Sequence, residues 1–115
     1  MLPRENRLTA KSDFEYVRQN GNRISTPIFS VSYVKRDSIV SLQNDTLPRF
    51  GFIVSKKIST KAHIRNKAKR RLRETVRKNL NSVKPGFDYV IIAKPGIVHA
   101  THDTIEAQVK KALCS

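Results

Sequence analysis

The stretch SKKISTKAHIRNKAKRRLRETVRK, residues 55–78, decides how the rest of the chain is organised. It holds eleven of the 23 lysines and arginines of the 115-residue chain, with a single acidic residue, Glu74. Its second half contains no glycine or proline, and Ala, Leu, Lys, Arg and Glu all favour helices. The sequence therefore predicts a helix over residues 65–79.

The predicted helix has two faces of different character. At about 100° per residue, one stripe is apolar and can dock on a core: Ala68, Leu72, Val76 and Leu80. A second stripe, centred roughly 110° away, carries an amide and four cations: Asn66, Lys69, Arg70, Arg73 and Arg77. Cations in the first turn oppose the helix dipole, and like charges four residues apart repel each other. Because few acidic residues balance these cations, the pattern favours a polyanionic partner over a merely solvated face.

The composition agrees with one domain over residues 1–115 that binds a polyanion, either a nucleic acid or an anionic membrane surface. The net charge is +14, the pI is near 10.5, and 38% of the residues are hydrophobic, which is typical of a globular chain with a polyanionic partner. No apolar run is long enough to span a bilayer, and no signal-peptide pattern is present at the N-terminus. The single cysteine, Cys114, cannot form an internal disulfide, so we expect a reducing, cytoplasmic setting. Because no segment can span a bilayer and the apolar stripe of the helix is narrow enough to be buried in the core, we expect no membrane partner.

Around the basic stretch, the order of predicted elements is helix, two or three strands, helix, strand, helix. The first helix spans residues 12–20 with a capping box at Ser12 and Glu15, and the last follows a cap at Thr101. Strands are predicted at residues 28–34, 49–54 and 87–93, with another short one in the polar segment at 39–42. This order predicts an α+β fold around a mixed central sheet.

Alternation within the strands predicts which side chains share a face. In the strand at 28–34, Phe29, Val31 and Tyr33 share one face, and the serines at 30 and 32 lie on the other. In the strand at 49–54, Gly51 lies opposite the apolar residues and leaves room for a close approach. The continuous apolar run at 87–93 predicts a central strand covered on both faces.

The residues that carry chemistry predict no catalytic residue and no metal site. The nine acidic residues are scattered along the chain, without the clusters that hold catalytic metal ions. His99 and His102 have the spacing of metal ligands but lack two further partners, and His63, in a basic loop, suits a phosphate contact. No glycine-rich phosphate loop is present. On the residues alone, this is a binding protein without a catalytic centre of its own.

Several motifs resemble one known family. The segment RNKAKRRLRE at 65–74 fits the R-N-x-x-K-R-x-x-R-E pattern of the protein subunit of bacterial ribonuclease P. Around it stand NRL at 6–8, SDF at 12–14, the alternating strand at 29–33, GFIVSKKI at 51–58 and DYVIIAKPG at 88–96. The resemblance covers nearly the whole chain, in the order and spacing of the family.

This resemblance implies a fold and a function. The fold would be α-β-β-β-α-β-α, of the ribosomal-protein-S5-domain-2-like type. The protein would bind the catalytic RNA of ribonuclease P and the 5′ leader of precursor tRNA, and assist the endonucleolytic removal of the leader. It would thus be the subunit of an endoribonuclease whose catalysis resides in the RNA. Magnesium would act in the RNA-containing holoenzyme, with no cofactor bound by the protein alone and no DNA partner. The alternative is a non-catalytic RNA-binding protein of another ribonucleoprotein, such as the ribosome.

The resemblance also assigns roles to residues. The RNA-binding set, which includes Arg77 from the cationic stripe, is Lys56, Lys57, Arg65, Asn66, Lys69, Arg70, Arg73, Arg77, Arg4, Asn6 and Arg7. A leader-binding cleft between the first helix and the sheet would involve Phe14, Arg18, Phe29, Val31 and Tyr33. Tyr33 fits the cleft and the core equally well, and Arg18 stands where many members have an aromatic residue. The loop at 59–64 is one residue longer than usual and lacks the glycine of the family.

Overall fold

The computed structural model describes residues 6–8, 11–35, 48–83 and 86–113 of the chain. Within these ranges the elements follow the order α1 (Lys11–Asn20), β1 (Asn22–Ser25), β2 (Phe29–Lys35), β3 (Arg49–Ile53), α2 (Ala62–Lys78), β4 (Phe87–Ala93) and α3 (His102–Leu113). Short 3₁₀ turns at Leu80–Ser82 and Pro95–His99 follow α2 and β4. The α-β-β-β-α-β-α order is confirmed.

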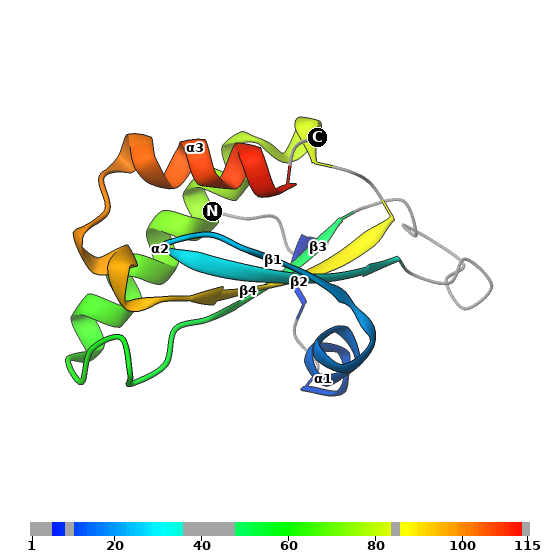
Figure 1. Ribbon diagram of the computed structural model, residues 1–115, viewed down its shortest axis with the longest axis horizontal. Helices are drawn as coiled ribbons and strands as arrows, with labels where there is room; N and C mark the ends of the chain where they lie inside the picture. Colours follow the sequence, from blue (N-terminus) through cyan, green and yellow to red (C-terminus); the bar gives the residue numbers. More distant parts are fainter. Residues whose placement is uncertain (1–5, 9–10, 36–47, 84–85, 114–115) are drawn as a thin grey trace.

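The strands form one mixed sheet in the order β1-β2-β4-β3. β1 pairs with β2 and β2 with β4 in antiparallel fashion, whereas β3 and β4 are parallel and are connected through α2. Figure 1 shows α1 on one face of the sheet and both α2 and α3 on the other. The predicted α+β class is confirmed, and β4, which lies between β2 and β3, is covered on both faces as expected.

The main core lies between the sheet and the pair α2 and α3. From α2 it receives the predicted stripe, in which Ala68, Leu72 and Val76 are buried and Leu80 is half-buried. From α3 it receives Ile105, Val109 and Leu113. The large side chains of the sheet point to the same side, among them Phe29, Val31, Phe50, Tyr89 and Ile91. Two amphipathic helices are thus fixed against one face because each buries its apolar stripe there.

A smaller cluster lies between α1 and the opposite face of the sheet. Val17 of α1 is fully buried against Val90 and Leu8, and the Phe14 ring packs at the margin of this cluster. The ring sits directly over Gly51 of β3, where a side chain would overlap it. The close approach predicted at Gly51 is therefore confirmed, and its occupant is the ring of Phe14.

Adding a methyl group at this contact tests how tightly α1 is seated. We expect Gly51→Ala to lower the free energy of unfolding by about 1–3 kcal/mol, because the new Cβ overlaps the Phe14 ring and forces α1 outward. Urea unfolding followed by circular dichroism measures this change. The Gly51→Ala/Phe14→Ala double variant should lose less stability than the two single variants added together, since the clash disappears with the ring. Strict additivity would mean that the ring does not set the helix position.

Polar contacts fix the two strands that frame α2. Asp88 of β4 is buried and accepts hydrogen bonds from Nε and Nη2 of Arg49 on β3, at 2.8 and 2.7 Å. Such a two-pronged pair is oriented more strongly than a single contact. Residues 6–8 run along the outer edge of β3, where Arg7 bridges to Phe50 and the Leu8 amide donates to the Phe50 carbonyl at 2.8 Å.

The structure corrects several predicted boundaries. α2 begins at Ala62, three residues before the predicted start, and α1 begins at Lys11, so Ser12 lies inside its first turn and does not precede it. β1 was not predicted, because its four residues include a single apolar side chain, Ile24. The Thr101 cap is confirmed, since its hydroxyl accepts the Thr104 amide at 3.2 Å. The strand predicted at 39–42 lies outside the described residues.

Candidate nucleic-acid interface

α2 presents a cationic face because its other side is held by the core. With Leu72 and Val76 buried, the stripe of Asn66, Lys69, Arg70, Arg73 and Arg77 is turned away from the sheet. Asn66, Arg70 and Arg77 are exposed, while Lys69 and Arg73 are half-buried. The half-buried pair lays its apolar stems along the helix and keeps the charged ends outward. We call this stripe the basic face.

The loop before α2 adds further cations and has a defined shape. The Ser55 carbonyl accepts the Ile58 amide at 3.0 Å, which closes a tight turn that leaves Lys56 and Lys57 exposed. The guanidinium of Arg65 donates to the Ser59 carbonyl at 2.8 Å and so ties the first turn of α2 back to the loop. Arg65, predicted to contact RNA, therefore also positions the loop that carries the two lysines.

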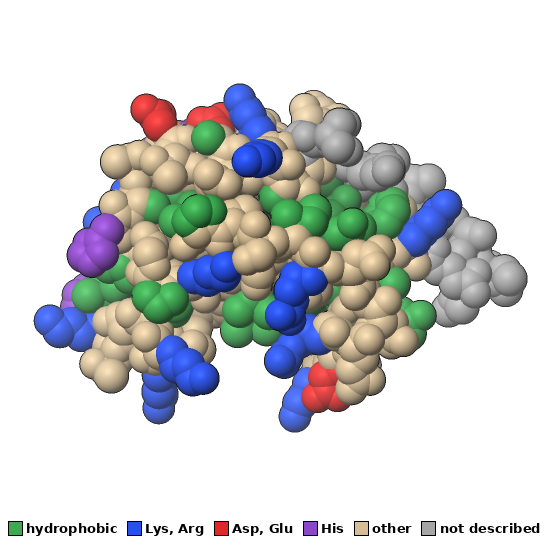
Figure 2. Space-filling view, in the orientation of Figure 1, with side chains coloured by type: hydrophobic (Ala, Val, Ile, Leu, Met, Phe, Trp, Pro, Cys, Tyr) green, Lys and Arg blue, Asp and Glu red, His purple; other side chains and the backbone are tan. Residues whose placement is uncertain are grey.

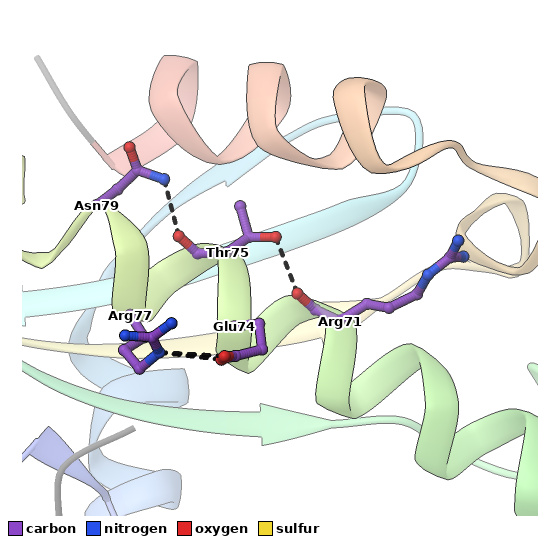
Figure 3. Close-up of polar contacts among 5 residues, drawn as sticks. All are labelled: Arg71, Glu74, Thr75, Arg77 and Asn79. Atoms are coloured by element: carbon purple, nitrogen blue, oxygen red, sulfur yellow. Dashed lines mark hydrogen bonds and ion pairs between the residues drawn. The ribbon is translucent and has the colours of Figure 1, made fainter. Parts of the chain in front are cut away.

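One acidic residue pairs with the basic face. Glu74 accepts hydrogen bonds from Nε of Arg77 at 2.9 and 3.1 Å (Figure 3). This contact lowers the pKa of Glu74 and raises the pKa of Arg77, because each stabilises the charged form of the other. Both side chains are about two-fifths exposed, at 38% and 40%, so water competes with the pair. A phosphate can therefore exchange with the carboxylate of Glu74 at little cost.

The cations of α2 do not all point the same way. Arg71 turns toward the opposite side of the helix, where its guanidinium donates to the Ala100 carbonyl at 3.2 Å, just before α3. Further along, the Thr75 hydroxyl donates to the Arg71 carbonyl at 2.9 Å and the Asn79 amide to the Thr75 carbonyl at 2.8 Å (Figure 3). Arg71, Thr75 and Asn79 thus hold the C-terminal half of α2, and Arg71 lies apart from the basic face.

A second region of interest lies where α1 meets the sheet. Figure 2 shows a hollow at the lower edge of the molecule, between α1 and the part that carries the loop before α2. Lys and Arg side chains lie on both sides of this hollow. On α1 and the strand that follows it, four polar side chains line a pocket: Glu15, Arg18, Gln19 and Arg23. Arg18 was predicted for a cleft at α1, and Arg23 was missed because β1 itself was missed.

Three residues predicted for the same cleft lie elsewhere. Phe29, Val31 and Tyr33 belong to the core under α2 and α3, on the opposite face of the sheet from α1. Of the predicted cleft residues, Phe14 and Arg18 alone lie on the α1 side. The prediction placed the apolar face of β2 under α1, but two long amphipathic helices cover more area than one short helix and take the bulky side chains. The face turned to α1 carries Ser30, Ser32 and Val34 of β2.

The N-terminal residues of the predicted RNA-binding set also differ from each other. Asn6 is 7% exposed, and its side-chain amide donates to the Pro48 carbonyl at 2.7 Å, so this side chain joins the N-terminal segment to the residue before β3. Arg7 is exposed beside β3, whereas Arg4 lies outside the described residues.

Among the residues that the structure describes, no three His, Cys, Asp or Glu side chains gather as a metal site would require. None of the described helices is both long and apolar enough to cross a bilayer.

Comparisons with known proteins agree on one family. A family model described as Ribonuclease P matches residues 2–115. The chain is 36% identical over 115 residues to the ribonuclease P protein component of Streptomyces griseus, covering 98% of this chain and 93% of that one. Against the component from Clavibacter michiganensis the identity is 34%, with 98% and 94% covered. The RNase P protein from Thermotoga maritima has a TM-score of 0.79 at 27% identity, with 93% and 94% covered.

Proposed function

The chain belongs to the ribonuclease P protein component family, whose members take part in tRNA processing, and we propose that its basic face binds the catalytic RNA of that enzyme. In this proposal Lys56 and Lys57 extend the same contact from the loop before α2. Arg7 lies at the edge of β3 and contributes from there.

The observation that carries this proposal is that α2 buries its apolar stripe in the core and turns its cations outward. The apolar stripe of the helix is buried in the core, so α2 has no wide apolar face left to contact a membrane. The outward cations lie three and four residues apart, which suits rows of phosphate, and arginine binds phosphate with two parallel hydrogen bonds. Binding a polyanion also removes the mutual repulsion of these cations. Neutralising several phosphates would make the affinity steeply dependent on salt.

For the substrate, we propose that the hollow beside α1 holds the 5′ leader of precursor tRNA. Arg18 and Arg23 line a pocket at one side of this region, and their charges suit the phosphates of a single strand. Figure 2 shows Lys and Arg side chains on the other side of the hollow as well. A strand in this hollow would lie on a different face of the sheet from α2 and α3.

The cleavage itself we assign to the RNA partner. The described residues do not gather the carboxylates that a catalytic magnesium ion needs, so we assign no part of the cleavage to a metal ion held by the protein. Magnesium would act within the RNA. We place this work in the cytoplasm, because a chain with one cysteine needs no oxidising compartment to fold.

The test is cleavage of precursor tRNA at low magnesium by the cognate catalytic RNA, with and without this protein. We expect the protein to restore cleavage at the 5′ end, and the protein alone to cut nothing. An Arg65→Ala/Arg70→Ala variant should require a higher protein concentration, because it loses one cation of the basic face and the anchor of the loop. If the wild type binds other structured RNA but leaves this cleavage unchanged, a role in another ribonucleoprotein replaces the proposal.

A further inference from the structure

His63 lies in the first turn of α2, one turn before the basic face begins. The helix starts at Ala62 rather than at Arg65, so His63 has helical backbone. The amides of Ile64 and Arg65 both donate to the Lys61 carbonyl, at 3.2 and 3.3 Å, and close this first turn. The prediction that placed His63 in a loop is therefore wrong, and the helix fixes the direction of its side chain.

Helical spacing turns His63 outward together with the basic face. At about 100° per residue, His63 lies about 20° around the helix from Arg70 and about 60° from Asn66. Leu72, at the centre of the buried stripe, lies about 180° away. The side chain of His63 is accordingly exposed. His63 thus extends the basic face by one turn toward the N-terminus of α2.

Within the described part of the chain, His63 has no polar partner. It forms no hydrogen bond or ion pair with any described residue. The charged side chains nearest to it in sequence and on the next turn are the cations Lys61 and Lys67, and the turn Pro95–His99, which packs against α2, adds His99. β3 and α3 pack on the opposite side of α2, and their charged or titratable groups are Arg49, His102, Asp103, Glu106, Lys110 and Lys111. An anion from outside the chain therefore meets no described carboxylate that is paired with His63.

The other two histidines of the chain have different surroundings. His102 begins α3, and its Nε2 lies 3.6 Å from an Oε2 carboxylate oxygen of Glu106. His99 is exposed in the turn after β4, outside the helix that carries the basic face. Of the three histidines in the sequence, His63 is therefore the one aligned with the cations of α2.

We propose that His63 is a further contact of the basic face with a phosphate of the catalytic RNA, and that this contact tightens binding as the pH falls. The inference rests on the proposed binding of that RNA by the basic face. Histidine is the side chain that gains charge between about pH 8 and pH 5, and a phosphate favours the charged imidazolium. Because the bound state favours the proton, binding takes up protons and the affinity is greatest at the acidic end of this range. At the alkaline end the neutral imidazole still donates one hydrogen bond, without the charge.

The test measures the affinity of the protein for the cognate catalytic RNA at about pH 5.5 and about pH 8, at constant salt. We expect the wild type to bind about three- to tenfold more tightly at the lower pH. Its slope of log affinity against log salt should be steeper there by about one, as for one added phosphate contact. His63→Gln should show nearly the same affinity and slope at both pH values, close to those of the wild type at the higher pH. His63→Lys should bind tightly at both.

A matched control separates this position from histidine in general. His99→Gln removes an exposed histidine outside the basic face and should keep the pH response of the wild type. Thermal unfolding at both pH values verifies that each variant is folded, and His63→Gln breaks no hydrogen bond among the described residues. If the wild type shows no pH response, if His63→Gln retains it, or if His99→Gln abolishes it, the inference is overturned. If the wild type binds the catalytic RNA at neither pH, the proposed function itself falls.

Discussion

Replacing Lys69, Arg70 and Arg73 together by alanine is expected to weaken binding of the catalytic RNA by about 100-fold at physiological salt. The three side chains lie on the basic face, outside the buried stripe, so their loss removes phosphate contacts and leaves the core intact. The slope of log affinity against log salt should become shallower by about two to three, one for each lost contact. Filter binding over a series of salt concentrations measures both quantities.

A matched variant separates the position of these charges from their number. Lys35, Lys110 and Lys111 are exposed on β2 and α3, and replacing all three by alanine lowers the net charge by the same amount. We expect this control to change the affinity by no more than about threefold, through the general field of the protein alone. Equal losses in the two triple variants would show that overall charge, and not the basic face, governs binding.

Leu72→Ala is expected to lower the free energy of unfolding by about 3–4 kcal/mol. Leu72 is fully buried at the centre of the α2 stripe, where it packs among side chains of the sheet and α3. Truncation removes its apolar contacts and leaves a cavity that the surrounding core fills only in part. Such a loss is a large part of the stability of a small domain, so denaturant titration should detect it readily.

The last position of the same stripe serves as the control. Leu80 is only half-buried, in the turn after α2, and Leu80→Ala should cost about half as much because less area leaves the core. At temperatures where both variants are folded, each should bind RNA nearly as well as the wild type. A Leu72→Ala protein with unchanged stability would contradict the docking of α2 through this stripe.

The sequence allowed the elements and the buried stripes to be predicted, but not which helix covers which face. The 3.6-residue period identified Leu72 and Val109 as core residues because helical geometry fixes their direction. Alternation in β2 correctly separated Phe29 from Ser30. Periodicity states only that residues share a face, and the choice between the two faces depends on how much apolar area the helices bring. The choice depends on tertiary packing, and it led to the error at Phe29 and Val31. For Tyr33, which fitted the cleft and the core equally well, the structure shows the core.

The predicted interface residues divide in a similar way. The basic face followed directly from helical spacing, and its outward orientation follows from the burial of the opposite stripe. The motif resemblance could not reveal that Asn6 donates to Pro48, a contact between residues far apart in sequence. Nor could it reveal that Arg65 holds the loop through the Ser59 carbonyl. Arg23 was missed because β1 is short and polar, and strands of that kind carry almost no periodic signal.

The segment at residues 6–8 has a consequence for how the free protein behaves before it meets its partner. The outer edge of β3 holds Phe50 and Phe52, and an open strand of this kind is a template for pairing with a second chain. The bridge from Arg7 and the hydrogen bond from Leu8 occupy part of that edge. These contacts use part of the hydrogen-bonding capacity of the β3 edge, so less of that edge is left open for pairing with a second chain.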